Sequence, residues 1–211
     1  MKFRSLPLLL LLLVGMSGVA LGGKFNKVLS PGDAAPEWKD VPGIDGKKYS
    51  LADFKDKDVL VVVVTCNSCE YAVDVEDRLA ALGKKLKKEG KCALVAICPS
   101  PPKVEEDAPE ELAKRAKEKG FNFPYLVDPT QQTVRAFGAT RTPEFFVFNK
   151  DRKLVYQGNL DDSPEGKKEI TKRFVEDAVA AALAGEKPAV EETAPIGCLV
   201  RFLKTRPAGK K

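Results

Sequence analysis

The chain has 211 residues, a formal net charge of +5 and 31% charged residues. Basic and acidic residues alternate along its helical stretches, which is typical of a solvated surface and argues against nucleic-acid binding. The sequence contains no histidine, and this removes the Ser-His-Asp and Cys-His routes to an activated nucleophile. The composition therefore disfavours hydrolases, and the length suits one domain with a full core.

The first 22 residues have the pattern of a secretion signal. Lys2 and Arg4 form a charged start, residues 6–14 an apolar middle, and Ala20-Leu21-Gly22 a small-x-small exit. The apolar middle is shorter than the roughly 20 residues that span a bilayer. We therefore expect an exported protein, periplasmic or extracellular, which contacts a membrane only if this segment is not cleaved.

The next part of the chain predicts a turn-rich extension followed by a buried strand. Residues 24–57 are rich in Gly, Pro and Asp, and Asp45-Gly46 predicts the turn of a β-hairpin over residues 43–51. The β-branched run Val59–Val64 is too short for a helix and alternates too little to be half exposed. It therefore predicts a central strand.

A helix and a second strand follow. Apolar residues recur three or four apart from Cys69 to Glu89, which predicts one amphipathic helix that ends at Gly90. The apolar stretch Cys92–Ile97 predicts the next strand. Because strand, helix and strand follow one another over this length, we expect a right-handed parallel crossover.

The second half predicts short helices and strands in alternation, and then a tail. Turn residues separate the segments, and a charged turn at 149–152 joins the last two strands as an antiparallel hairpin. Beyond Gly185 the chain becomes a proline-containing basic tail, residues 185–211, and we expect its basic end, residues 204–211, to be mobile. The expected elements are helix 110–119, strand 123–127, helix 130–137, strands 145–148 and 154–158, and helix 167–183.

Cys66-Asn67-Ser68-Cys69 lies between the predicted central strand and the predicted helix. A thiol at a helix N-terminus is favoured as the thiolate, so we expect a lowered pKa for Cys66. Cys69 follows one helical turn later and can resolve a mixed disulfide formed by Cys66. A C-x-x-C motif also occurs at zinc and haem attachment sites, and the flanking strand and helix favour a redox pair here. Thr142-Pro143, which enters the strand 145–148, is a candidate cis peptide bond.

These features together resemble the thioredoxin fold, an α/β fold with a central mixed β-sheet flanked by helices, here with an N-terminal hairpin extension. The resemblance covers residues 31–184, and we expect the domain to span residues 24–184. Within this superfamily the chain is similar to the peroxiredoxin and redoxin branch, whose site reads Cys-Asn-His-Cys-Pro-Tyr-Val. The matching segments are 31–36, 45–47, 50–54, 66–73, 121–128, Gln131, 138–143 and 195–198.

The resemblance implies thiol-disulfide exchange, with Cys66 as the catalytic nucleophile and Cys69 as the resolving thiol. It assigns Thr142 and Pro143 to substrate docking, through pairing of the Thr142 backbone with a substrate strand, and to keeping metal away from the thiols. The implied partners are protein or small-molecule disulfides and dithiols and a further redox partner, with no cofactor and no resident metal. The direction of exchange, reduction or oxidation, stays open.

The chain departs from the family pattern at three points. Ser68 and Glu70 replace a histidine and a proline, which removes a cationic neighbour of the thiolate and adds a carboxylate. Leu60 stands where thioredoxins carry a buried aspartate that helps proton transfer. Cys98 stands where this branch commonly has asparagine, so it is a candidate third thiol beside the pair.

The remaining cysteines can be sorted in part by geometry. Cys92 and Cys98 lie on one predicted strand, about 20 Å apart at roughly 3.3 Å per residue, and cannot bond each other. Cys198 either bridges to one of them or stays reduced. We expect Cys92 to be a buried packing thiol, and Cys98 and Cys198 are possible accessory thiols.

Four alternatives to thiol-disulfide exchange stay open. A peroxidase needs a threonine or serine three residues before its reactive cysteine, where this chain has Val63, with Thr65 adjacent and misplaced. A metal-handling module for Cu(I) or zinc would have to recruit Cys98 or Cys198 as a further ligand. The others are a binding protein on a thioredoxin scaffold and an inert surface disulfide.

Overall fold

The computed structural model describes residues 22–99, 101 and 103–204. The expected signal segment lies outside this part of the chain except for its last residue. Within the described ranges, no helix combines the length and apolar character needed to cross a membrane.

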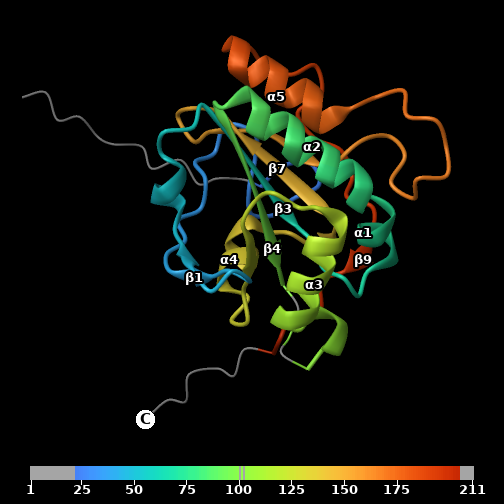
Figure 1. Cartoon of the computed structure of the whole chain (residues 1–211). Helices are drawn as coiled ribbons and strands as arrows, with labels where there is room; N and C mark the ends of the chain where they lie inside the picture. The colour runs from blue at the N-terminus through green and yellow to red at the C-terminus, as the bar shows by residue number, and fades with distance from the viewer. Residues whose placement is uncertain (1–21, 100, 102, 205–211) are drawn as a thin grey trace, which may run out of the picture.

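A five-stranded mixed sheet forms the centre of the molecule, with helices on both faces (Figure 1). Its strands, in order across the sheet, are β5 (Tyr125–Val127), β4 (Cys92–Cys98), β3 (Val59–Val64), β7 (Glu144–Phe148) and β8 (Leu154–Gly158). Strands β3, β4 and β5 are parallel, whereas β7 runs antiparallel to both β3 and β8. The arrangement confirms the predicted mixed sheet and the parallel crossover from β3 to β4.

The central strand β3 is buried along its whole length. All six of its residues have no exposed surface, because β4 and β7 cover its edges and apolar layers cover both of its faces. Branched side chains pack well on such a pleated surface, which explains the run of valines. The burial brings the carboxyl end of β3, and the Cys66 loop after it, to a fixed position.

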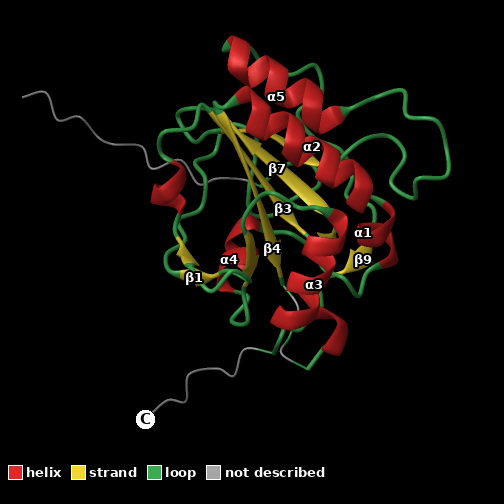
Figure 2. Cartoon of the chain, viewed as in Figure 1, coloured by secondary structure: helices red, strands yellow, loops and turns green. Residues whose placement is uncertain are grey.

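Two apolar layers hold the helices against the sheet. One layer carries Val59, Val61 and Val63 and packs under α2 and α5, which lie side by side in Figure 2. The other carries Leu60, Val62 and Val64 and packs under α4 and the N-terminal extension. The first layer includes residues of α1 (Glu70–Asp74), α2 (Glu76–Glu89), α3 (Pro109–Lys119) and α5 (Phe174–Ala184), and the second those of α4 (Gln132–Phe137) and the 3-10 helix η1 (Leu51–Phe54).

Two helix predictions need correction. The helix expected over 69–89 is broken at Val75, whose backbone conformation separates α1 from α2. The terminal helix begins at Phe174 instead of Lys167. The Asp162 carboxylate accepts hydrogen bonds from the backbone N–H groups of residues 171 and 172, at 3.0 and 3.2 Å, and so holds the preceding segment as a loop.

The N-terminal hairpin is present and joins the sheet at its β5 edge. Strands β1 (Val41–Pro42) and β2 (Lys48–Tyr49) pair antiparallel, so the hairpin has the predicted turn and begins two residues before the predicted range 43–51. Asp45 accepts hydrogen bonds from the Lys47 N–H and the Tyr49 hydroxyl, which closes the turn. The Ile44 N–H donates to the carbonyl of Tyr125 in β5, at 2.9 Å.

The C-terminal segment stays packed against the body of the molecule beyond residue 185. Strand β9 (Cys198–Leu199) pairs antiparallel with β6 (Arg141–Thr142). Just before it, the Ile196 N–H donates to Asn159, at 2.9 Å. Polar side chains of the sheet region therefore hold residues that have a loop-like composition, and only residues 205–211 of the expected tail lie outside the description.

Candidate functional site

The two cysteines of the C-x-x-C motif lie at the carboxyl end of β3, as predicted. Cys66 is 7% exposed and Cys69 is 1% exposed. Cys69 is the N-cap residue of α1, and its carbonyl accepts the first backbone hydrogen bonds of that helix. The strand end and the helix start thus position the two sulfurs together.

Thr142 and Pro143 lie directly against this pair. The Thr142-Pro143 peptide bond is cis, as the sequence analysis proposes. Because β3 and β7 pair with Val64 opposite Glu144, the cis bond comes to the same end of the sheet as the thiols. The Cys66 Sγ lies 3.6 Å from the Thr142 hydroxyl, and the Cys69 thiol donates to the Thr142 carbonyl at 3.0 Å.

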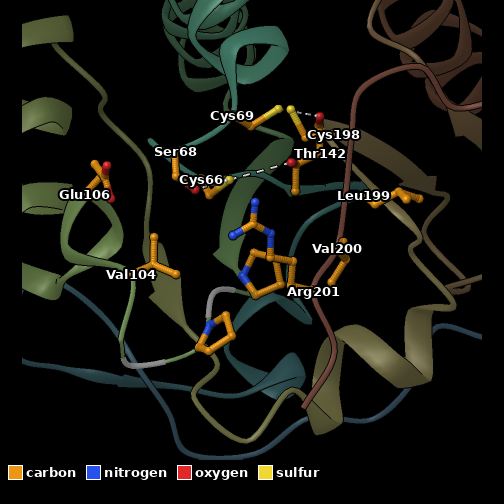
Figure 3. Close-up of a pocket in the computed structure, with 12 residues that line it drawn as sticks. Cys66, Ser68, Cys69, Val104, Glu106, Thr142, Cys198, Leu199, Val200 and Arg201 are labelled. Atoms are coloured by element: carbon orange, nitrogen blue, oxygen red, sulfur yellow. Dashed lines mark hydrogen bonds between the residues drawn. The ribbon is translucent and has the colours of Figure 1, made fainter. Parts of the chain in front are cut away.

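A cavity of about 530 Å³ opens in front of the cysteines (Figure 3). One wall is the C-x-x-C loop, the second is formed by Pro99, Pro101, Val104 and Glu106, and the third is the C-terminal segment 198–201. The Arg201 side chain extends into this space in Figure 3. The lining residues are Cys66, Ser68, Cys69, Pro99, Pro101, Val104, Glu106, Thr142, Cys198, Leu199, Val200 and Arg201.

Cys198 is the third thiol at the site. The β6–β9 register places Cys198 opposite Thr142, and its side chain lies close enough to Cys69 to lower the pKa of that thiol. The backbone N–H groups of Glu70 and Tyr71 also face its sulfur. Burial and the neighbouring Cys69 raise the pKa of Cys198 to about 11.

The strand pairing also bears on the docking role predicted for Thr142. The backbone edge expected to receive a substrate strand is paired with β9 in this structure. Close approach of the two strands depends on Gly197, which has a φ of +153° and whose position leaves no room for a Cβ beside the Thr142 carbonyl. The Arg141 guanidinium donates to the Gly197 carbonyl at 2.6 Å.

The other two cysteines lie elsewhere. Cys98 has no exposed surface and, among the described residues, it is Cys198 and not Cys98 that lines the cavity. Cys92 is buried at the opposite end of β4, where it pairs with Val59, as expected for a packing thiol. All five cysteines stand as thiols, so the considered bridge from Cys198 to Cys92 or Cys98 is absent among the described residues.

Asp107 holds the C-x-x-C loop and was not singled out from the sequence. It ends the 3-10 helix η2 (Glu105–Asp107) and is 5% exposed. Its carboxylate accepts hydrogen bonds from the N–H groups of Asn67 and Ser68, at 2.6 and 2.9 Å, and from the Ser68 hydroxyl at 2.5 Å. No local pattern marks this aspartate, because it meets the loop only through the packing of α3 on α2.

The thiolate preference predicted for Cys66 needs correction. The neighbouring Cys69, burial and the Asp107 carboxylate raise the pKa of Cys66, while the hydroxyls of Thr142 and Ser68 act in the opposite direction. The sequence argument assumed that backbone N–H groups of the loop face the sulfur. Two of them donate to Asp107 instead, which brings a negative charge near the thiol.

Glu144 is a second buried carboxyl that the sequence analysis missed. It follows the cis proline, is 3% exposed, and accepts hydrogen bonds from the N–H groups of Thr140 and Arg141, at 2.9 and 3.2 Å. Burial raises its pKa to about 7. The carboxyl therefore holds the loop that carries Thr142.

Within the described part of the chain, no group of three or more His, Cys, Asp or Glu side chains is placed to hold a metal ion. The metal-handling alternative thus gains no support from the geometry.

A model of the Redoxin family matches residues 30–174, which is more than half of the chain. The chain belongs to the Redoxin family. The match includes the C-x-x-C loop, the cis proline and Asp107, and it ends before Cys198. The resemblance to the redoxin branch is confirmed at the level of the family, and the motif itself stays a prediction.

The relatives of this Redoxin-family protein carry two kinds of name. It is 32% identical over 143 residues to "Putative peroxiredoxin MT2597" of Mycobacterium tuberculosis (60% of this chain, 83% of that protein). It is 26% identical over 173 residues to "Thiol-disulfide oxidoreductase ResA" of Bacillus thuringiensis subsp. konkukian (79% and 93%). A solved structure of hypothetical protein SMc02350 from Sinorhizobium meliloti 1021 matches with a TM-score of 0.79 at 30% identity (85% and 98%). These findings confirm the predicted thioredoxin-like fold and an oxidoreductase.

Proposed function

We propose that this Redoxin-family protein is an exported thiol-disulfide oxidoreductase that works through Cys66 and Cys69. The observation that carries the proposal is that both sulfurs contact Thr142, beside the cis proline, at the floor of an open cavity. Its substrates are disulfides or dithiols of proteins or small molecules. No cofactor is needed, because the two thiols supply and accept the electron pair.

The first step is attack by Cys66 on a substrate disulfide in the cavity. The Cys66 thiol loses its proton to solvent, and the Thr142 hydroxyl, 3.6 Å away, donates to the resulting thiolate, while the Ser68 hydroxyl donates to Asp107. A bond forms between Cys66 Sγ and one substrate sulfur. The substrate S–S bond breaks, and the other substrate sulfur leaves as a thiolate.

The second step is release of the product by Cys69. Its sulfur is held 3.0 Å from the Thr142 carbonyl, on the protein side of Cys66. Cys69 loses its proton and attacks Cys66 Sγ, so that the Cys66–Cys69 disulfide forms and the mixed disulfide breaks. The substrate sulfur that was bonded to Cys66 leaves with the electron pair. The same steps in reverse insert a disulfide into a substrate.

The test is reduction of insulin disulfides with a small dithiol as electron source. Cys66→Ser should abolish the turnover, and Cys69→Ser should leave a trapped mixed disulfide at Cys66 that mass spectrometry detects. Cys92→Ser is the matched control, because Cys92 is buried at the far end of β4, and it should retain the rate. Full insulin reduction by Cys66→Ser would contradict the proposal.

A peroxidase is the second candidate function. Two hydroxyls, Thr142 Oγ1 and Ser68 Oγ, lie 3.6 Å from the Cys66 sulfur, although Val63 occupies the position that the sequence pattern requires. The Mycobacterium tuberculosis relative also carries the name peroxiredoxin. Consumption of hydrogen peroxide that survives Cys69→Ser but not Cys66→Ser would favour this function over disulfide exchange.

Export rests on the charged and apolar pattern of residues 1–22. The test is cell fractionation of the full chain in a bacterial host, with N-terminal sequencing of the recovered protein. A mature N-terminus near residue 23 in the periplasm or medium is expected. Recovery of the intact chain in the cytoplasm would overturn the export part of the proposal and leave the chemistry in place.

A further inference from the structure

A third thiol lies beside the proposed redox pair, on a strand that the Redoxin match does not include. Cys198 faces Cys69 from β9, and both line the cavity (Figure 3). The three sulfurs come from two segments that are more than a hundred residues apart in the sequence.

We propose that Cys198 is a further redox-active residue, which takes the disulfide from the Cys66–Cys69 pair by forming a Cys69–Cys198 bridge. The inference rests on the proposed disulfide exchange and adds the residue through which the pair exchanges electrons with an external partner.

The strand that carries Cys198 is held on both sides of the cysteine. Before it, Asn159 accepts a hydrogen bond from the Ile196 N–H at 2.9 Å. After it, Gln131 donates to the Arg201 carbonyl at 2.9 Å and accepts from the Leu203 N–H at 2.7 Å. Gln131 has no exposed surface, so this anchor is part of the folded body. The hydrogen bonds of Asn159 and Gln131 therefore position Cys198 beside Cys69.

Exposure distinguishes the three sulfurs. Cys69 is 1% exposed and Cys66 is 7% exposed, whereas Cys198 is only partly buried and its neighbour Leu199 is 67% exposed. A protein partner that cannot reach Cys69 can reach Cys198 at the rim of the cavity. A disulfide moved to Cys198 becomes accessible without unfolding of the C-x-x-C loop.

The chemistry is an internal exchange that needs no additional oxidant. Cys198 loses its proton to solvent, with the N–H groups of Glu70 and Tyr71 facing the resulting thiolate. The thiolate attacks Cys69 Sγ of the Cys66–Cys69 disulfide. The Cys69–Cys198 bond forms, the Cys66–Cys69 bond breaks, and Cys66 leaves with the electron pair and takes up a proton. An external dithiol then reduces the new bridge by attack on Cys198.

The proposal is tested by mapping disulfides after oxidation of the purified protein with oxidised glutathione. Trypsin leaves Cys66 and Cys69 in one peptide, 58–78, and Cys198 in another, so a bridge to Cys198 joins two peptides. We expect this cross-linked pair as a major product in the native sequence and in Cys66→Ser. In Cys69→Ser it should fall at least tenfold.

A kinetic measurement keeps the two proposals distinguishable. Replacement Cys198→Ser should slow reduction of the oxidised protein by bacterial thioredoxin at least fivefold and leave reduction by dithiothreitol within twofold. Cys98→Ser is the matched control and should change neither rate. If the Cys66–Cys69 disulfide forms but no cross-linked pair appears, or if Cys198→Ser is reduced like the native sequence, the role of Cys198 is overturned while disulfide exchange by the pair stands.

Discussion

The Asp107 carboxylate accepts three hydrogen bonds from the C-x-x-C loop, and it adds to the effects of Cys69 and burial on the Cys66 thiol. Asp107 has two effects on the site. The carboxylate orders the loop by accepting the N–H groups of Asn67 and Ser68, and its charge raises the pKa of the Cys66 thiol. Together with Cys69 and burial, the carboxylate therefore favours the protonated form of Cys66.

Asp107→Asn should speed alkylation of Cys66. The substitution removes the negative charge and keeps one oxygen as an acceptor, so the pKa of Cys66 falls. At a pH below the pKa, each unit by which the pKa falls raises the thiolate fraction about tenfold. We therefore expect the alkylation rate of Cys66 to increase by up to about tenfold at pH 7. The measurement is the rate of iodoacetamide modification mapped to Cys66.

The control for this prediction is Glu106→Gln. Glu106 lines the same cavity, and it contacts the loop through its backbone carbonyl, which accepts from Asn67 at 3.0 Å. Its side-chain charge can therefore be removed without loss of that contact. Equal acceleration in both variants would show a general charge effect and not a role of Asp107.

The raised pKa of Glu144 predicts that the free energy of unfolding depends on pH. Its pKa is raised to about 7 in the folded state from an ordinary value of 4.5. Below pH 4.5 the carboxyl is protonated in both states, and between pH 4.5 and 7 the folded state holds the proton more tightly. Its contribution to stability is thus lost as the pH rises through 7, by about 3 kcal/mol at about 1.4 kcal/mol per unit.

Urea unfolding of the native sequence and of Glu144→Gln measures this contribution. The difference between the two free energies of unfolding should change by a few kcal/mol between pH 4.5 and pH 8, in favour of the variant at high pH. All other titrating groups are common to both proteins and cancel. A difference that is independent of pH would contradict the buried, proton-binding state of Glu144.

At the scale of elements, the β6–β9 pairing is what brings Cys198 to the site. Gly197→Ala should displace β9, because a Cβ would overlap the Thr142 carbonyl and the φ of +153° is unfavourable for alanine. We expect the Cys69–Cys198 cross-link to fall several-fold while the Cys66–Cys69 disulfide still forms. Disulfide mapping by mass spectrometry measures both.

Gly120→Ala is the matched control, because it introduces an unfavourable backbone conformation without a steric overlap of the new Cβ. Gly120 ends α3 with a φ of +67°, and no atom lies within 4 Å of the position of an added Cβ. It should cost about 1 kcal/mol of stability from the backbone conformation alone. It should leave the cross-link unchanged. The same loss of cross-link in both variants would indicate general destabilisation.

The sequence predicts some elements well because their signals are local. Val59–Val64 combines β-branched residues with continuous apolar character, and residues 76–89 combine helical spacing with a glycine stop. The start of α5 at Phe174 depends instead on Asp162, whose carboxylate holds backbone N–H groups nine and ten residues later. The order of residues 186–204 depends on side chains such as Asn159. Neither contact leaves a pattern in the segment that it orders.

At the scale of the whole molecule, the site combines what the sequence predicts with what only the topology supplies. Cys66, Cys69 and the cis Pro143 were expected together, because a strand-end motif and a family resemblance mark them. Asp107 meets Asn67 from 40 residues away. Cys198 reaches Cys69 only because the chain returns across β6. The predicted direction of the Cys66 pKa shift is wrong because Cys69, burial and Asp107 together raise the pKa of this thiol.

The return of the chain across β6 has a consequence for recognition of large partners. The Arg141 and Thr142 backbone groups on that edge already face Leu199 and Cys198. An unfolded polypeptide that binds there as an additional strand must first displace β9. This displacement separates the sulfur of Cys198 from those of Cys66 and Cys69. Access of a strand-like substrate to this edge is thus coupled to movement of the chain's own terminus.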